Sequence, residues 1–141
     1  MEPIATAKLE DGALVVVDSA PIIYLLEGHA TRARRFRPLF DRHSRGELSF
    51  AVTTITIAEV LTGPLLAGDE ALAERYRAVL TSWYVVELTA EIAVSAARLR
   101  AALKLTLPDA VQAASALAVN ADALVTHDRD FTRLGALRVL G

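Results

Sequence analysis

Four acidic residues stand where an α/β protein would bind a ligand. Asp18 directly follows a short β-branched run, and Asp128 closes a second apolar run near the end of the chain. Asp109 lies in the first turn of a predicted helix, and Glu59 lies about one turn into another, among apolar neighbours. Ligands of open parallel sheets bind beyond the carboxyl ends of the strands. These positions therefore predict an acidic pocket at that edge of a sheet.

The chemistry of such a pocket follows from its charge. Carboxylates about 4 Å apart, in a medium of effective dielectric about 20, repel each other by roughly 4 kcal/mol per pair. A divalent cation removes this cost, and an all-oxygen ligand set favours Mg²⁺ or Mn²⁺. Such an ion activates water and stabilises charge on a phosphodiester. The chain has no cysteine and three widely spaced histidines, which excludes a thiolate zinc site and argues against an all-histidine one.

Each acidic residue also has a purely structural interpretation. Asp18, Asp109 and Asp128 could cap helices, since aspartate is a preferred N-cap residue. Glu59 could be an ordinary exposed residue of its helix. The spacing alone leaves both interpretations open.

Alternating strand and helix patterns predict the elements that would position these residues. The predicted strands are Leu14–Val17, Leu48–Val52, Tyr84–Leu88, Ala123–Thr126 and Leu137–Leu140. The predicted helices are Ser19–Gly28, Thr31–Ser44, one from Thr53 or Thr54 toward Gly63-Pro64, Glu70–Thr81, Thr89–Leu103 and Ala110–Asn120. A break is allowed at Pro38. Leu105–Leu107 is predicted as a loop, and Asp130–Leu134 as a short turn or helix. This order predicts a three-layer α/β/α sandwich with a central, mostly parallel sheet of four to five strands. We expect a single domain over residues 1–141, with residues 1–13 as an N-terminal arm.

Composition fits one ordinary core. The 141 residues are 53% hydrophobic and 23% charged, which excludes a disordered chain. No segment reaches the roughly 18 uncharged apolar residues of a membrane helix, and no signal peptide is visible, so we expect a cytoplasmic protein without a membrane partner.

The net charge of −2 does not indicate a generally basic nucleic-acid binder, but the arginines are unevenly placed. Six of them fall within one predicted helix and its end: Arg32, Arg34, Arg35, Arg37, Arg42 and Arg45. A solvated helix face explains any one of them. As a group they form a candidate phosphate-binding patch, because the guanidinium fork suits phosphate oxygens.

Three segments together resemble PIN-domain ribonucleases, most closely the VapC toxins of bacterial toxin–antitoxin pairs. They are LVVVDSAPIIYLLE, TITIAEVLTGP and LTLPDAVQAASALAVNADALVTHDRDF. The resemblance spans about residues 14–140. Its acidic motifs stand in the family's order at Asp18, Glu59, Asp109 and Asp128, with Thr126 and Phe131 around the last. Any one motif is weak, but four in order are specific.

The resemblance implies a Mg²⁺- or Mn²⁺-dependent endoribonuclease of the PIN fold, acting on targets such as tRNA or ribosomal RNA. It implies Asp18 and Asp109 as direct metal ligands, Asp128 as a direct or water-mediated one, and Glu59 as a residue that holds the ion through water or positions the nucleophile. The resemblance implies that Ser19 and Thr126 support the metal ligands by hydrogen bonds. Asp130 has the same implied role unless it only caps a helix. His127 receives no catalytic role, because strand alternation points it away from the pocket. The candidate RNA-binding residues are Arg32, Arg34, Arg35 and Arg37.

The resemblance also implies partners. They are a cognate antitoxin whose tail blocks the pocket and a second copy of the chain, giving a homodimer or a toxin–antitoxin hetero-oligomer. Two predicted helices are candidates for the dimer face, Glu91–Leu103 and Glu70–Thr81 with Tyr76 and Trp83 near the latter. Core packing is the competing interpretation for both.

Other enzyme classes fit less well. A phosphohydrolase of the haloacid-dehalogenase type needs a second aspartate two residues after Asp18, where this chain has Ala20. A receiver domain needs a late lysine, and a dinucleotide-binding domain needs a glycine-rich turn after the first strand, and both are missing. The alternative that remains is a catalytically inert PIN-fold module that binds RNA or protein.

Overall fold

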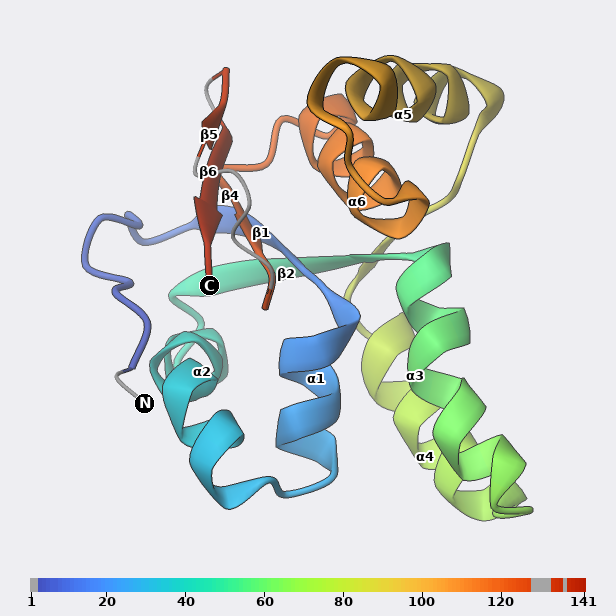
Figure 1. Ribbon diagram of the computed structural model, residues 1–141. Coiled ribbons are helices and arrows are strands. Elements are labelled where there is room, and N and C mark those ends of the chain that lie inside the picture. The colour runs from blue at the N-terminus through green and yellow to red at the C-terminus, as the bar shows by residue number, and fades with distance from the viewer. Residues whose placement is uncertain (1–2, 128–132, 136) are drawn as a thin grey trace.

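A twisted parallel sheet forms the centre of the molecule (Figure 1). The structure is a computed structural model that describes residues 3–127, 133–135 and 137–141. Within these residues the strand order is β3-β2-β1-β4-β6-β5, in which all neighbours are parallel except β5 and β6. The strands are β1 Ala13–Val17, β2 Leu48–Thr53, β3 Tyr84–Val86, β4 Ala123–Val125, β5 Arg133–Leu134 and β6 Leu137–Leu140. The predicted, mostly parallel sheet is confirmed.

Helices cover both faces of this sheet, which confirms the three-layer sandwich. The described residues form α1 Ser19–Leu26, α2 Ala30–Ser44, α3 Thr54–Leu66, α4 Glu70–Thr81, α5 Ala90–Leu103 and α6 Leu107–Ala118. Figure 1 shows α5 and α6 above the sheet, with α1 to α4 on the other side. None of these helices, in the part of the chain that the structure describes, is long and apolar enough to cross a membrane.

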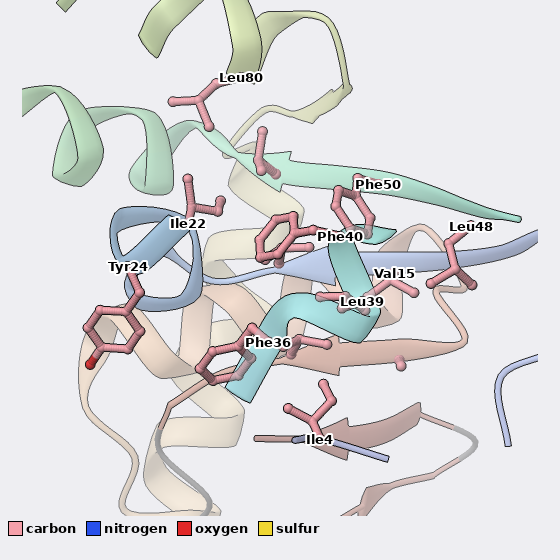
Figure 2. Close-up of a cluster of buried hydrophobic side chains, with 14 of the residues drawn as sticks. Ile4, Val15, Ile22, Tyr24, Phe36, Leu39, Phe40, Leu48, Phe50 and Leu80 are labelled. Carbon is pink, nitrogen blue, oxygen red and sulfur yellow. The ribbon is translucent and has the colours of Figure 1, made fainter. Parts of the chain in front are cut away.

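The β-branched runs form strands because both of their faces are buried. Val15 and Val17 point to the face covered by α1 to α4, whereas Val16 between them points to the face covered by α5 and α6. All three side chains are fully buried. Figure 2 shows how Phe36, Leu39 and Phe40 of α2 lie over the strands in the first of these two cores.

Several element ends differ from their predicted positions. Helix α3 continues through Pro64 to Leu66 instead of ending near Gly63-Pro64, because the proline removes only one backbone hydrogen bond while the helix stays packed. Helix α2 ends at Ser44 as predicted, without the break that the sequence allowed at Pro38. Helix α6 begins at Leu107, which was predicted to lie in a loop, because Thr106 caps the helix there. It ends at Ala118 and not at Asn120. The third and fourth strands are shorter than predicted, ending at Val86 and Val125.

The prediction of a short turn or helix over residues 130–134 is wrong for the last two of these residues. Arg133 and Leu134 form β5, which pairs antiparallel with β6 through the tight turn at Gly135. The positive φ of 59° at that turn is accessible to glycine at little cost. Residues 128–132 lie outside the described residues, so the rest of that prediction is not tested.

The N-terminal arm is built into the fold by one arginine. Arg42 of α2 donates from Nη1 to the backbone carbonyl of Thr6 (2.7 Å), from Nη2 to Asp11 (2.9 Å) and from Nε to Glu47 (3.0 Å). The side chain of Arg42 is only 12% exposed. Ile4 and Leu9 of the arm are buried in the core beside α2. The arm is therefore a packed element that lies against α2.

Candidate active site

The strand order places a ligand site beside β1. The chain leaves β1 for β2 and β3 on one side, then returns to β4 on the other side. Open α/β sheets bind ligands at such a reversal, outside the carboxyl ends of the strands. Asp18 follows β1 and Thr126 follows β4, so both residues stand at this reversal.

Asp18 is fixed first by its own backbone. Its N–H donates to the carbonyl of Val125 (2.8 Å), which ties it to β4. Its Oδ1 accepts from the N–H of Ser19 (2.7 Å), so the carboxylate caps α1. Asp18 is therefore an N-cap, as its structural interpretation predicts, and its half-buried carboxylate also lies at the predicted edge of the sheet.

Two further side chains hold the carboxylate of Asp18 from opposite sides. The hydroxyl of Thr126 donates to Oδ2 (2.9 Å), and the amide Nε2 of Gln112 on α6 donates to Oδ1 (2.8 Å). The same Nε2 donates to Oγ1 of Thr56 on α3 (2.6 Å), and Thr56 lies near Oγ1 of Thr53 (3.3 Å). Gln112, Thr56 and Thr126 are all almost completely buried. This network joins four segments of the chain to one carboxylate.

Glu59 and Asp109 belong to the same electrostatic site as Asp18. Although much of Glu59 is exposed, burial at its carboxyl group raises the pKa of Glu59, and the charges of Asp18 and Asp109 raise it further. A hydrogen bond from Ser19 acts in the opposite direction. Asp109 is half-buried in the first turn of α6, where its N–H donates to Thr106 (3.3 Å). The start of α6 therefore reaches the carboxylate edge, as the predicted pocket requires.

The structure does not complete a metal site from the described residues. Within residues 3–127, 133–135 and 137–141, no three acidic or histidine side chains lie close enough together to hold an ion. Asp128, Asp130 and Phe131 are outside the described residues, so their predicted roles are not tested. The available donors are carboxylate oxygens, and Oε1 of Gln112 is buried without a hydrogen-bond partner among the described residues. A hard cation such as Mg²⁺ fits this oxygen-rich chemistry.

Two buried site residues were missed by the reasoning from sequence, although a signal for each exists. Gln112 lies three residues after Asp109, and Thr56 lies three residues before Glu59. Residues three apart share a helix face. A polar residue three positions from a site carboxylate, within an otherwise apolar stretch, is therefore a candidate for the same site.

The arginine cluster divides into structural and exposed members. Arg42 holds the arm, and Arg45 pairs with Glu47 at 2.6 Å. Arg32 lies over the ring of Tyr24, with Cζ 5.4 Å from the ring centre. Arg35 lies over Phe36 at 5.9 Å, and the remaining two candidates, Arg34 and Arg37, are exposed along α2.

The fold and the acidic edge define a class of α/β protein, and comparison with known families identifies it. The model of the PIN domain family matches residues 15–137. The chain belongs to the PIN domain family, which confirms the resemblance seen in its motifs. A search of curated proteins found no match.

Solved structures with the same fold come from several bacteria. A toxin–antitoxin complex from Klebsiella pneumoniae is 24% identical with a TM-score of 0.69, over 87% of this chain and 94% of that one. VapBC2 from Rickettsia felis, bound to a DNA fragment from its promoter, is 19% identical with a TM-score of 0.67, over 89% and 96%. VapC20 of Mycobacterium tuberculosis, a toxin that cleaves the sarcin–ricin loop, is 16% identical with a TM-score of 0.65, over 82% and 91%. At these identities the likeness concerns the fold.

Proposed function

We propose that the protein is a metal-dependent endoribonuclease and the toxin of a VapC-type toxin–antitoxin pair. The observation that carries the proposal is the carboxylate of Asp18, held by Gln112 and Thr126 in the electrostatic field of Glu59 and Asp109. A stability role alone does not account for this arrangement, because like charges at one edge destabilise a fold. Membership of the PIN domain family and the toxins among its structural neighbours support the same assignment.

In this proposal the acidic residues hold a divalent cation and orient water. Asp18 and Asp109 are direct ligands of Mg²⁺ or Mn²⁺, with Asp128 as a further ligand. When bound, the ion supplies positive charge to the phosphate and activates a water molecule. Glu59 at the rim positions that water.

The supporting residues act on the geometry of the ligands. Thr126, Ser19 and Gln112 keep the Asp18 carboxylate in one orientation, as supporting hydrogen bonds do at metal sites. Asp130 is a further candidate for this supporting set. Hydrolysis by water would leave a 3′-hydroxyl and a 5′-phosphate.

The proposed partners follow from the same assignment. The substrate is RNA, with tRNA and ribosomal RNA as the first candidates, and a small antitoxin protein covers the acidic pocket. We also propose a homodimer through α5. Of the two candidate helices, α4 turns Tyr76 into the core, where its hydroxyl contacts the carbonyl of Leu26, whereas α5 leaves Val94 54% exposed.

Cleavage of total cellular RNA by the purified protein, free of antitoxin, tests the proposed function. Wild type with Mg²⁺ or Mn²⁺ should give discrete products, and EDTA should abolish them. Asp18→Asn should lose at least 100-fold in rate, because it removes a metal ligand. Asp41→Asn, an exposed aspartate on α2, is the control for the substitution itself and should cleave like wild type. Absence of products from wild type at every metal concentration would favour an inert binding module.

A further inference from the structure

A group of aromatic and cationic side chains lies next to the proposed active site. Tyr24 of α1 is 8% exposed, and two imidazoles meet its ring edge-on. The ring centre of His29 lies 5.6 Å from that of Tyr24, and the ring centre of His127 lies 5.7 Å from it. Phe36 stacks on Tyr24 from the core, with ring centres 6.2 Å apart. Figure 2 shows Tyr24 beside Phe36, with its hydroxyl pointing away from the other labelled side chains.

Arg32 adds a positive charge to this group. Its guanidinium carbon lies 5.4 Å from the ring centre of Tyr24, and its side chain is exposed. It forms no ion pair with any residue that the structure describes, unlike Arg42 and Arg45. The start of α2 next to it carries no acidic residue in its first turn, and His29 makes no side-chain capping bond there. The nearby carboxylate is that of Glu27, 3.5 Å from Nε2 of His29.

The group is joined to the carboxylate site through one peptide bond. His127 directly follows Thr126, whose hydroxyl holds Oδ2 of Asp18. His127 is exposed, and its contact with Tyr24 sets the direction of its ring. A strand that extended from Asp18 toward Tyr24 would meet the imidazole of His127 and the guanidinium of Arg32 there.

We propose that His127, His29 and Arg32, ordered by the ring of Tyr24, form a nucleotide subsite for single-stranded RNA beside the scissile phosphate. This inference rests on the proposed function. A base stacks on the imidazole of His127, and Arg32 binds a neighbouring phosphate. Aromatic platforms next to a cation are the general means of binding single strands, because every base has a face that stacks. A polyanion also needs positive charge near a pocket that is itself acidic.

The stacking part is tested by binding of a mixed-sequence single-stranded RNA octamer to the Asp18→Asn protein. Adding His127→Ala should raise Kd about tenfold, the usual effect of removing one stacking partner. Adding His127→Phe instead should restore binding to within about twofold, because phenylalanine keeps the stacking face. If the phenylalanine variant binds as weakly as the alanine variant, stacking is overturned. Both substitutions are at an exposed position, so folding is checked simply by the melting temperature.

The charge part uses a matched arginine on another helix. Arg32→Gln should raise Kd about tenfold and reduce the slope of log K against log salt by about 0.7, the value for one contact to a single strand. Arg75→Gln, at an exposed position of α4, changes the net charge equally and should leave both quantities within about twofold of the parent. Equal losses in the two variants would overturn the subsite in favour of general charge attraction.

Cleavage by wild type, measured in parallel, separates the two proposals. If wild type cleaves RNA while His127→Ala and Arg32→Gln bind like Arg75→Gln, the subsite is wrong and the proposed function stands. If wild type neither binds nor cleaves RNA, the proposed function fails and the subsite fails with it. Selective loss of RNA affinity in the His127 and Arg32 variants, together with cleavage by wild type, supports both.

Discussion

The carboxylate of Asp18 accepts from three separate segments of the chain, at Ser19, Gln112 and Thr126. Of these donors, Gln112 is the most deeply buried: its Nε2 donates to both Asp18 and Thr56, and its Oε1 has no partner in the part of the chain that the structure describes. A buried amide oxygen without a partner costs free energy. The presence of Gln112 among the buried alanines of α6 therefore favours a role in orienting Asp18 over a role in stability.

Gln112→Met should therefore separate activity from stability. Methionine has a similar shape but cannot donate to Asp18, so we expect RNA cleavage to fall about 10- to 100-fold, the usual effect of losing a supporting residue at a metal site. The melting temperature should change little, since the unpartnered oxygen is removed along with the two hydrogen bonds. Ser115→Ala is the control, because Ser115 is also buried on α6 and its hydroxyl has no partner within the described ranges. Unchanged cleavage by Gln112→Met would contradict the orienting role.

His43 makes stability depend on pH. Its imidazole stacks on Phe50 with ring centres 4.1 Å apart, and burial lowers the pKa of His43 below 6.5. The unfolded chain therefore binds a proton more readily than the folded one as the pH falls below 6.5. The contribution of His43 is fully present above that pH and is lost as the pH decreases through the lowered pKa.

His43→Phe keeps the stacking and removes the titration. We expect the free energy of unfolding of wild type to fall more steeply than that of His43→Phe between pH 7 and pH 5, as measured by urea denaturation. Other groups titrate equally in both proteins, so the difference reports on His43. Parallel pH profiles for the two proteins would show that the imidazole does not titrate abnormally.

At the residue scale, the sequence predicted the carboxylates better than their partners. Asp18 and Asp109 stand at a strand end and a helix start, and Glu59 stands inside the helix that follows β2, all in elements that local patterns reveal. Gln112 and Thr56 meet only when α3 and α6 come together across the sheet. No local pattern contains that contact.

At the scale of elements, the N-terminal arm is the part that periodicity describes least. Residues 3–12 have no repeating pattern, yet Ile4 and Leu9 are core residues. Their position depends on Arg42, which lies about thirty residues further along the chain and donates to the arm at Thr6 and Asp11. The sequence places the end of α3 near Gly63-Pro64, whereas the helix continues to Leu66, because packing overrides a single proline.

Arg42→Met should release the arm. The carbonyl of Thr6 would lose its charged donor, at a cost of about 1–3 kcal/mol in the free energy of unfolding. Exchange of the Ile4 amide hydrogen, which is bonded to the carbonyl of Arg35, should accelerate as well. Arg45→Met is the comparison, because Arg45 is 58% exposed and also pairs with Glu47 but does not contact the arm. Equal destabilisation by both variants would mean that the ion pair with Glu47, and not the arm, is what matters.

At the scale of the whole molecule, α5 is the outermost helix of its layer. It packs on α6, and a groove between the two is lined by Ser95, Arg98, Leu99, Ala114, Leu117 and Ala118. Val94, Leu103 and Leu107 on these helices are exposed. The mean hydropathy of +0.36 is high for a chain of this size, which fits an apolar surface covered by a second copy.

Val94→Glu should therefore convert the proposed dimer into a monomer. A charge at the centre of an apolar interface is costly to bury, so we expect the mass measured by light scattering to halve. Val79→Glu places the same change at an exposed valine of α4, the other candidate face, and should leave the mass unchanged. Dissociation by Val79→Glu alone would move the interface to α4.

The position of β4 beside β1 also sets the order in which the carboxylate site can assemble. Asp18 is synthesised early, but Gln112 and Thr126, which hold its carboxylate, come from the last third of the chain. A partly synthesised chain that ends before α6 therefore has β1 paired with β2 alone and an Asp18 carboxylate without the donors Gln112 and Thr126. The carboxylate is held in its final orientation only once the chain through Thr126 has been made and has folded onto β1.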